Sequence, residues 1–226
     1  MENNGKGIFY GVIGVATLIV AIIGATFAFF SASATVEGNN TLTGATNENI
    51  GGALSASVTR LDVRDTATAG PGLVPATNDL GTASEITKAA TAKCVVAGYT
   101  GCHLYKIYAK TTLAVQSATL KLDEIKLTDV KNSADWKYVL YQGTSETAPG
   151  ATINKKSFNG TGDVLFDGAM TAGQEETWYL LVYIENKDVA QNDETNDETN
   201  VLGSYSGSVS FAAAGGGKVS ATFVSA

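Results

Sequence analysis

The stretch TWYLLVYIE, residues 177–185, carries the strongest strand signal in the chain. Its even-numbered residues from 178 to 184 are Trp, Leu, Val and Ile, and its odd-numbered residues from 179 to 183 are Tyr, Leu and Tyr. Successive side chains of a strand point to opposite faces, so both faces here carry apolar groups. Such a strand is typical of the centre of a sheet, or of a sheet that another layer covers.

Seven further segments have the alternating pattern, or the β-branched and aromatic composition, of strands. They are residues 53–63, 104–110, 117–127, 136–142, 163–166, 205–211 and 218–224. Turns rich in Gly, Asn and Asp separate them, and the one helix predicted among them is short, over residues 84–92 with Ser84 as its cap. Strands of this length and spacing predict an all-β fold, a jelly-roll or Ig-like antiparallel sandwich.

One of these segments changes phase along its length. In residues 117–127, leucines at positions 120 and 122 are followed by Ile125 and Leu127. One extra residue in a strand turns every later side chain to the opposite face. The pattern therefore predicts a bulge or a turn at Asp123 and Glu124.

An uncharged stretch near the amino terminus runs from Ile8 to Phe30 and reads IFYGVIGVATLIVAIIGATFAFF. As a helix, its 23 residues can cross the ~30 Å hydrocarbon core of a bilayer at ~1.5 Å per residue. Lys6 precedes it and no positive charge follows before Arg60, which favours the amino end inside the cell and the remainder outside. We therefore expect an extracellular or cell-surface protein that contacts a membrane through this helix, before cleavage or without it.

Three fates of this stretch stay open. Ala32 and Ala34 fit the small-x-small pattern of signal peptidase, which would cut before Thr35. The stretch is longer than the ~7–15 residues of a usual signal-peptide core, so an uncleaved membrane anchor is the second interpretation. The third is a cut after Gly7, which resembles type IV prepilins, although Val12 stands where those pilins usually carry a Glu.

The chain divides into three parts on this basis. Residues 1–34 are predicted to be a signal peptide or membrane anchor helix, and residues 35–52, which are small and polar, a flexible linker or donor arm. Residues 53–226 form the predicted β-sandwich domain. The whole chain of 226 residues has a net charge of −7 and a pI of about 4.7. This balance argues against nucleic acid as a partner, since phosphate binding needs clustered Lys and Arg.

The two cysteines of the chain, Cys94 and Cys102, are separated by seven residues that include two glycines. In an exported protein such a pair is expected to form a local disulfide, which stabilises a fold by ~2–3 kcal/mol in the chain-entropy model. Free thiols are an alternative. A zinc site is another, but it needs more ligands than two Cys and one His can supply.

Candidates for catalysis are few. The single histidine, His103, follows Cys102, and neighbours in a strand point to opposite faces, so the two are not expected to form a catalytic pair. No zinc-protease, serine-hydrolase or phosphate-loop motif is present. Nothing in the spacing of the carboxylates selects an acid–base pair among the obvious candidates, Asp123, Glu124, Asp163 and Asp167. The sequence thus predicts no catalytic residue, no cofactor site and no metal site.

One internal repeat, NDETNDET, occupies residues 192–199. Its carboxylates, from Asp193 to Glu198, could attract Ca²⁺, because calcium prefers oxygen ligands. The D-x-D-x-D-G spacing of an EF-hand is absent, and a solvated loop between two strands is the favoured interpretation.

The amino-terminal stretch closes with TFAFF, residues 26–30, and a β domain follows it. In this it resembles the TasA/camelysin family, exported matrix-fibre proteins of Gram-positive bacteria. The resemblance implies a leader cut by a dedicated signal peptidase, a jelly-roll fold, and biofilm fibres in which each subunit lends an amino-terminal strand to the next. The donor strand here would be residues 35–49, with Val36, Leu42 and Ala45 to fill pockets.

Two features depart from that family. Camelysins have been described as metalloproteases, but this chain has no zinc-binding motif, so the activity is not carried over. The pair Cys94 and Cys102 is also outside the family pattern. We therefore predict a non-enzymatic, self-associating structural subunit of a surface or matrix fibre. The alternatives are a membrane-anchored binding module and a pilin-like subunit.

Overall fold

The computed structural model describes residues 39–42, 53–62, 73–75, 79–130, 133–158, 162–187, 203–214 and 217–225. Several predictions concern residues outside these ranges. They are the predictions on the stretch from Ile8 to Phe30, on cleavage after Gly7, on the processing residues Ala32, Ala34 and Thr35, and on the acidic repeat. Among the described residues, no helix is long and apolar enough to cross a membrane.

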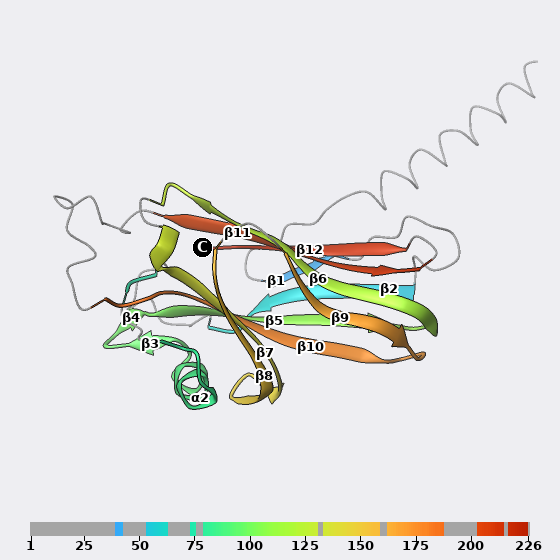
Figure 1. The fold of residues 1–226 in the computed structure, drawn as a ribbon, viewed down its shortest axis with the longest axis horizontal. Coiled ribbons are helices and arrows are strands. Elements are labelled where there is room, and N and C mark those ends of the chain that lie inside the picture. The colour runs from blue at the N-terminus through green and yellow to red at the C-terminus, as the bar shows by residue number, and fades with distance from the viewer. Residues whose placement is uncertain are drawn as a thin grey trace, which may run out of the picture. The chain divides into compact units, whose positions relative to one another are not determined.

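Two antiparallel sheets face each other and enclose the core (Figure 1). The larger sheet has the strand order β1 (Asn39–Leu42), β2 (Leu54–Arg60), β5 (Cys102–Thr111), β10 (Glu175–Ile184), β7 (Trp136–Ser145) and β8 (Ala148–Ser157). The smaller has the order β12 (Lys218–Val224), β11 (Ser204–Ala213), β6 (Val115–Thr128) and β9 (Asp163–Met170). The predicted all-β antiparallel sandwich is confirmed.

Three short elements complete the described part. Strands β3 (Val95–Val96) and β4 (Tyr99–Thr100) form a small hairpin, and a 3-10 helix, η2 (Ser133–Asp135), precedes β7. The α-helix, α2 (Ala83–Thr91), lies on the side of the larger sheet that faces away from the smaller one (Figure 1).

Strand β10 lies at the centre of the larger sheet, between β5 and β7. Its even-numbered side chains from Trp178 to Ile184 join the inner core, the apolar cluster between the two sheets. Its odd-numbered side chains from Tyr179 to Tyr183 join the outer cluster, in which the opposite face of the sheet is covered by α2. The apolar groups on both faces of TWYLLVYIE therefore correspond to a strand buried on both sides.

The predicted phase change in β6 is a bulge. On the neighbouring strand, Ser208 pairs with Glu124 while Val209 pairs with Leu122, so Asp123 is the extra residue. Its carboxylate accepts a hydrogen bond of 2.8 Å from the hydroxyl of Ser210. The bulge lets Leu122 and Ile125 both face the inner core.

The short helix is present, but its predicted cap is wrong. The cap is Thr82, whose extended backbone, with φ −119° and ψ 153°, lets its hydroxyl accept from the backbone N–H of Glu85 at 3.3 Å. Ser84 lies one residue inside the first turn. Ile86 and Ala90, four residues apart, carry the buried side of the helix.

The sequence pattern missed strand β8. Its sequence, APGATINKKS, does not alternate apolar and polar residues, because most of its side chains are exposed at the edge of the larger sheet. Strand β1, Asn39–Leu42, lies within residues 35–52, the predicted linker or donor arm, and pairs with β2 of the same chain.

Candidate functional site

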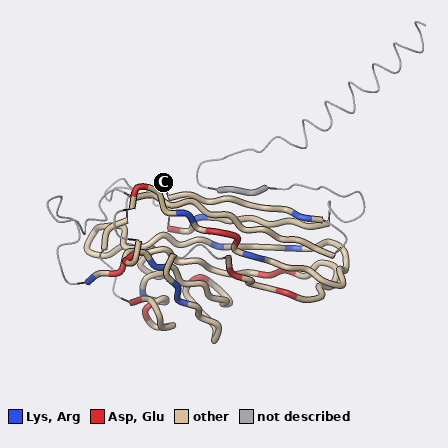
Figure 2. The backbone as a smooth tube through the Cα atoms, turned by 45° about the horizontal axis from the view of Figure 1, so that its top comes forward, with Lys and Arg blue, Asp and Glu red and all other residues tan. Residues whose placement is uncertain are grey.

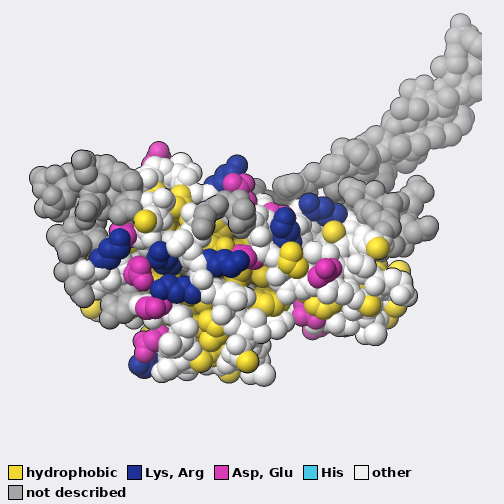
Figure 3. All heavy atoms as spheres, in the orientation of Figure 1, with side chains coloured by type: hydrophobic (Ala, Val, Ile, Leu, Met, Phe, Trp, Pro, Cys, Tyr) yellow, Lys and Arg dark blue, Asp and Glu magenta, His cyan; other side chains and the backbone are white. Residues whose placement is uncertain are grey.

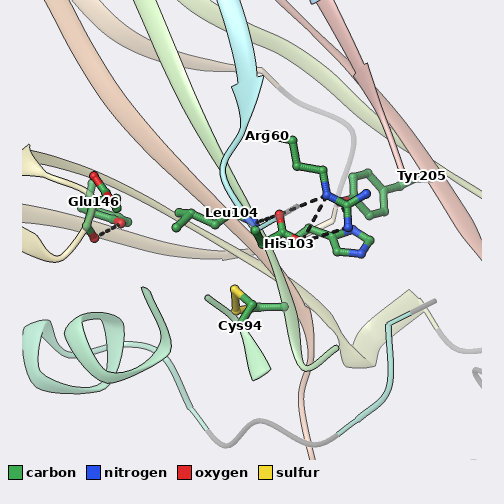
Figure 4. The surroundings of a disulfide bond; sticks show 9 residues. Arg60, Cys94, His103, Leu104, Glu146 and Tyr205 are labelled. Atoms are coloured by element: carbon green, nitrogen blue, oxygen red, sulfur yellow. Dashed lines mark hydrogen bonds and ion pairs between the residues drawn. A yellow bond between two sulfur atoms is a disulfide. The ribbon is translucent and has the colours of Figure 1, made fainter. Parts of the chain in front are cut away.

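Cys94 and Cys102 lie at disulfide-bonding distance, with their Cα atoms 4.9 Å apart, as expected from the sequence. Cys94 comes three residues after the end of α2, and Cys102 is the first residue of β5. Figure 4 shows the bridge beside the helix. It therefore joins the end of the helix to a central strand of the larger sheet. Both residues are about 1% exposed.

The turn that holds Cys94 is made of unusual backbone. Lys93, Cys94 and Ala97 have φ values of 48°, 60° and 48°, in the left-handed region that non-glycine residues rarely adopt. Gly98, with φ 85°, adopts such a conformation at little cost. The N–H of Cys94 donates to the carbonyl of Ala89 at 2.8 Å, which closes the helix end.

A second unusual site is a buried polar cluster on the other side of β5, which Figure 4 shows in part. It consists of Arg60, Asp62, His103, Tyr105 and Tyr205. The Nε and Nη2 atoms of Arg60 donate to the Asp62 carboxylate at 2.9–3.1 Å, and that carboxylate also accepts from the N–H of Leu104 at 2.9 Å. Burial lowers the pKa of Arg60, but the adjacent Asp62 outweighs this effect and leaves the pKa raised.

The hydroxyls of the cluster form one directed chain of hydrogen bonds. Tyr105 donates its single hydroxyl proton to the carbonyl of Val224 at 3.0 Å. At the 2.7 Å contact between the two phenols, Tyr205 must therefore be the donor. At the 2.6 Å contact with His103, it follows that the Nδ1–H of the imidazole donates to Tyr205.

Burial keeps the phenols of Tyr105 and Tyr205 neutral. Burial raises the pKa of Tyr105 to about 12 and raises that of Tyr205 well above its ordinary value. The hydrogen bonds from Tyr105 to Val224, and from the N–H of Ser225 to the carbonyl of Tyr205 at 2.8 Å, hold the end of β12 against β5 and β11. The cluster thus acts as a structural clamp. No pattern in the sequence points to this cluster, because its members come from three separate segments, at the end of β2, in β5 and in β11.

The expected separation of Cys102 and His103 is confirmed. Cys102 belongs to the outer cluster, whereas His103 contacts Tyr205 of the inner core. The two side chains point to opposite faces of β5, as neighbours in a strand do.

The structure gives each candidate carboxylate a different partner. Glu124 forms an ion pair of 3.7 Å with Lys126, and Asp167 accepts from the hydroxyl of Thr119 at 3.1 Å. Asp163 accepts from the hydroxyl of Tyr138 at 2.6 Å and forms an ion pair with Lys156. With Asp123 bound to Ser210, none of these contacts pairs one candidate with another. No group of three or more potential metal ligands occurs within the described ranges.

Charged side chains of both signs are interspersed along the described backbone (Figure 2). The face shown in Figure 3 likewise carries basic and acidic groups beside one another. Five of the ion pairs join exposed or half-buried lysines to carboxylates within 3.7 Å, at Lys88, Lys110, Lys126 and, twice, Lys155. Such pairs are typical of a solvated surface.

The four outer strands of the two sheets differ in how readily another strand could pair with them. Strand β8 contains Pro149, carries Lys155 and Lys156, and contacts α2, all of which oppose the addition of another strand. Strand β9 is bulged at Leu165, and β12 contacts β2 and β1. Strand β1 has only four residues, paired from Asn39 opposite Thr59 to Leu42 opposite Ala56. It is the shortest of the four outer strands as the structure describes them.

Together these features define an antiparallel β-sandwich with a disulfide-fastened outer layer and a short amino-terminal edge strand. Comparison with protein-family models finds no match for this chain, and comparison with curated proteins finds none either. The likeness to matrix-fibre proteins therefore stays a prediction.

Proposed function

We propose that this chain is an exported, non-catalytic structural protein, a subunit of a surface or biofilm-matrix fibre that assembles by strand donation. The observation that carries the proposal is the pairing of β1 with β2 at the edge of the larger sheet. Residues of the predicted donor arm already occupy a strand position there, and ten residues separate Leu42 from Ala53. A second copy can place its own arm in the same position with the same hydrogen bonds.

The strand order supports the jelly-roll form of the sandwich. Neighbours in each sheet are distant in sequence, as in β5 beside β10 and β6 beside β11. Most consecutive strands from β5 to β11 belong to opposite sheets, and only β7 and β8 pair directly. Jelly rolls have this nested arrangement, and matrix-fibre subunits are expected to share it.

The proposal can be tested by fixing the arm to its own sheet. Thr41 and Ser57 are directly opposite each other in the β1–β2 pair, and Cα atoms of such partners lie about 4.5–5.5 Å apart. That separation is within the range of disulfides. The double variant Thr41→Cys/Ser57→Cys, oxidised as a monomer, should form no fibres in negative-stain electron microscopy, while the wild-type chain does.

The matched controls are the two single variants, each of which should form fibres as the wild type does. Brief treatment of the double variant with a mild reductant should restore fibres, since the native bridge is about 1% exposed and reacts more slowly than the new one at the edge of the sheet. Fibres from the oxidised double variant would exclude donation by this arm. A wild-type chain that stays monomeric at high concentration would exclude the fibre itself.

Mass spectrometry of the native amino terminus separates the alternatives. A start at Thr35 is the expected result. A start at Ile8 would favour the pilin-like subunit, and a start at Met1 would favour a membrane-anchored binding module.

A further inference from the structure

The outer cluster is closed by a small element with little apolar surface of its own. Helix α2 has nine residues, and Ile86 and Ala90 are its buried side chains. Isolated helices shorter than ~12–15 residues are marginal in water, so α2 depends on being held against the sheet. Its cap and one exposed ion pair, between Lys88 and Glu85 at 2.8 Å, add little to that.

The backbone after α2 opposes docking. Within five residues, three non-glycine residues adopt the left-handed region. They are Lys93, Cys94 and Ala97. Residues in this region cost free energy and persist only where the surrounding structure fixes them. The bond from Cys94 to Cys102 is the covalent element that fixes this turn, because Cys102 is anchored in β5.

Beneath the helix lies an apolar face to which three strands contribute large side chains, whereas the buried side chains of the helix are Ile86 and Ala90. It is formed by side chains of β5, β7 and β10, all of which are less than 5% exposed: Leu104, Val139, Tyr141, Tyr179, Leu181 and Tyr183. Leu61, Leu80 and Ile153 also pack on this cluster, so loss of α2 would expose part of the face, and exposed apolar patches promote association.

We propose that the Cys94–Cys102 pair is a redox latch: the two-sheet sandwich folds in either state, and the outer layer docks only in the oxidised chain. An external disulfide acts as the oxidant. The thiolate of one cysteine attacks it to give a mixed disulfide and one free thiol, and the second cysteine displaces the other thiol. Two protons leave the protein and the external disulfide becomes two thiols. In a reducing compartment the helix stays undocked, and oxidation completes the domain.

The proposal separates two roles that a disulfide can have. A bridge that merely stabilises the whole domain would lower the protection of every strand when it is removed. A latch affects the segment from Ala83 to Thr100 and leaves β6 and β11 unchanged, since those strands contribute only to the inner core. The latch is independent of fibre formation, so the oxidised Thr41→Cys/Ser57→Cys chain would retain it.

Hydrogen exchange read by mass spectrometry distinguishes these outcomes in the full chain, kept in mild detergent. In Cys94→Ala/Cys102→Ala, amide protection over residues 83–100 should fall on the order of 50-fold, which matches the stabilisation expected of a short disulfide loop. Protection in β6 and β11 should change less than about twofold. The matched control is Thr82→Ala, which weakens the helix but keeps the bridge, and should lower the protection of residues 83–100 far less than loss of the bridge does.

A uniform fall of protection across both sheets would overturn the latch, and so would full protection of residues 83–100 without the bridge. If the double alanine variant does not fold, the folded wild type is treated with a phosphine reductant and followed in time. The latch then predicts that α2 loses protection while β6 and β11 keep theirs. Simultaneous loss in all three would contradict it.

Discussion

The inner core and the outer cluster share the same strand, β10, yet they are closed in different ways. The inner core lies between two sheets whose pairings join residues far apart in sequence, such as Leu180 opposite Leu140. The outer cluster is closed by one short helix, by Leu61, Leu80 and Ile153 packed beside it, and by a local disulfide whose cysteines are eight residues apart in sequence. Burial alone therefore does not decide how firmly a side chain is held. The rigidity of the layer that packs over the side chain matters as well.

The largest expected effect comes from a matched pair on β10. Leu180 and Leu181 are adjacent and both fully buried, one in the inner core and the other in the outer cluster. Replacing a buried leucine by alanine costs about 2–5 kcal/mol, and the cost falls where the surroundings can collapse into the cavity. Leu180→Ala should therefore approach the upper end of this range and Leu181→Ala the lower end, measured by guanidinium unfolding.

Equal losses in the two variants would show that α2 packs as rigidly as the second sheet. A larger loss for Leu181→Ala would reverse the comparison.

Alkaline pH should weaken both layers. Burial raises the pKa of Tyr105 and Tyr205 beside the inner core and of Tyr141, Tyr179 and Tyr183 in the outer cluster. The unfolded chain ionises near pH 10, while Tyr105 in the folded chain ionises at about 12. Its contribution to stability is thus complete below pH 10 and is lost as the pH rises from 10 to 12, by about 1.4 kcal/mol per unit.

The guanidinium concentration at the unfolding midpoint, measured at pH 8, 10 and 11, should fall steeply above pH 10. Tyr105→Phe should make that fall shallower, because one ionisable phenol is gone, while lowering stability at pH 8 by about 1 kcal/mol through its lost hydrogen bonds. An unchanged alkaline slope in this variant would show that Tyr105 does not carry the effect.

Substituting a glycine in each layer should give a smaller difference in stability between the layers. A Cβ at Gly207 would lie 2.3 Å from the ring of Phe223, which is buried in the inner core. Gly207→Ala must move that ring and should cost about 1–3 kcal/mol. Gly98, in the turn below α2, has open space around it but a φ of 85°, so Gly98→Ala should cost only about 1 kcal/mol, from backbone conformation.

Thermal unfolding by calorimetry would check both glycine variants. If Gly98→Ala were the more damaging of the two, the turn would be more tightly constrained than the inner core.

An effect as small as that of Gly98→Ala is expected at the helix cap. Thr82→Ala removes the hydrogen bond to Glu85 and should cost about 1 kcal/mol. Ser84→Ala is the matched control and should be nearly neutral, because Ser84 lies inside the first turn. The difference in unfolding midpoint between the two variants is the measurement. An equal loss in both would mean that the cap assignment is wrong.

Strands with buried faces could be predicted from the sequence, and exposed ones could not. The alternation in β5 and β12, the apolar run of β10 and the phase slip at Asp123 all follow from burial, which leaves a recognisable pattern in the residue types. Strand β8 has no such pattern, because most of its side chains are exposed to solvent. The polar cluster was also hidden, since Asp62, His103 and Tyr205 are distant in sequence and only the fold brings them together.

The distribution of aromatic residues gives the two layers separate optical signals. Both tryptophans of the chain, Trp136 and Trp178, belong to the inner core, while the outer cluster contains three tyrosines and no tryptophan. Excitation at the red edge of the absorption band selects indole, so tryptophan fluorescence reports on the sheets and is nearly blind to the helix. Tyrosine circular dichroism in the near ultraviolet carries a contribution from the stacked rings of Tyr141 and Tyr179, 5.2 Å apart, beneath α2. A single unlabelled sample thus contains a reporter for each layer.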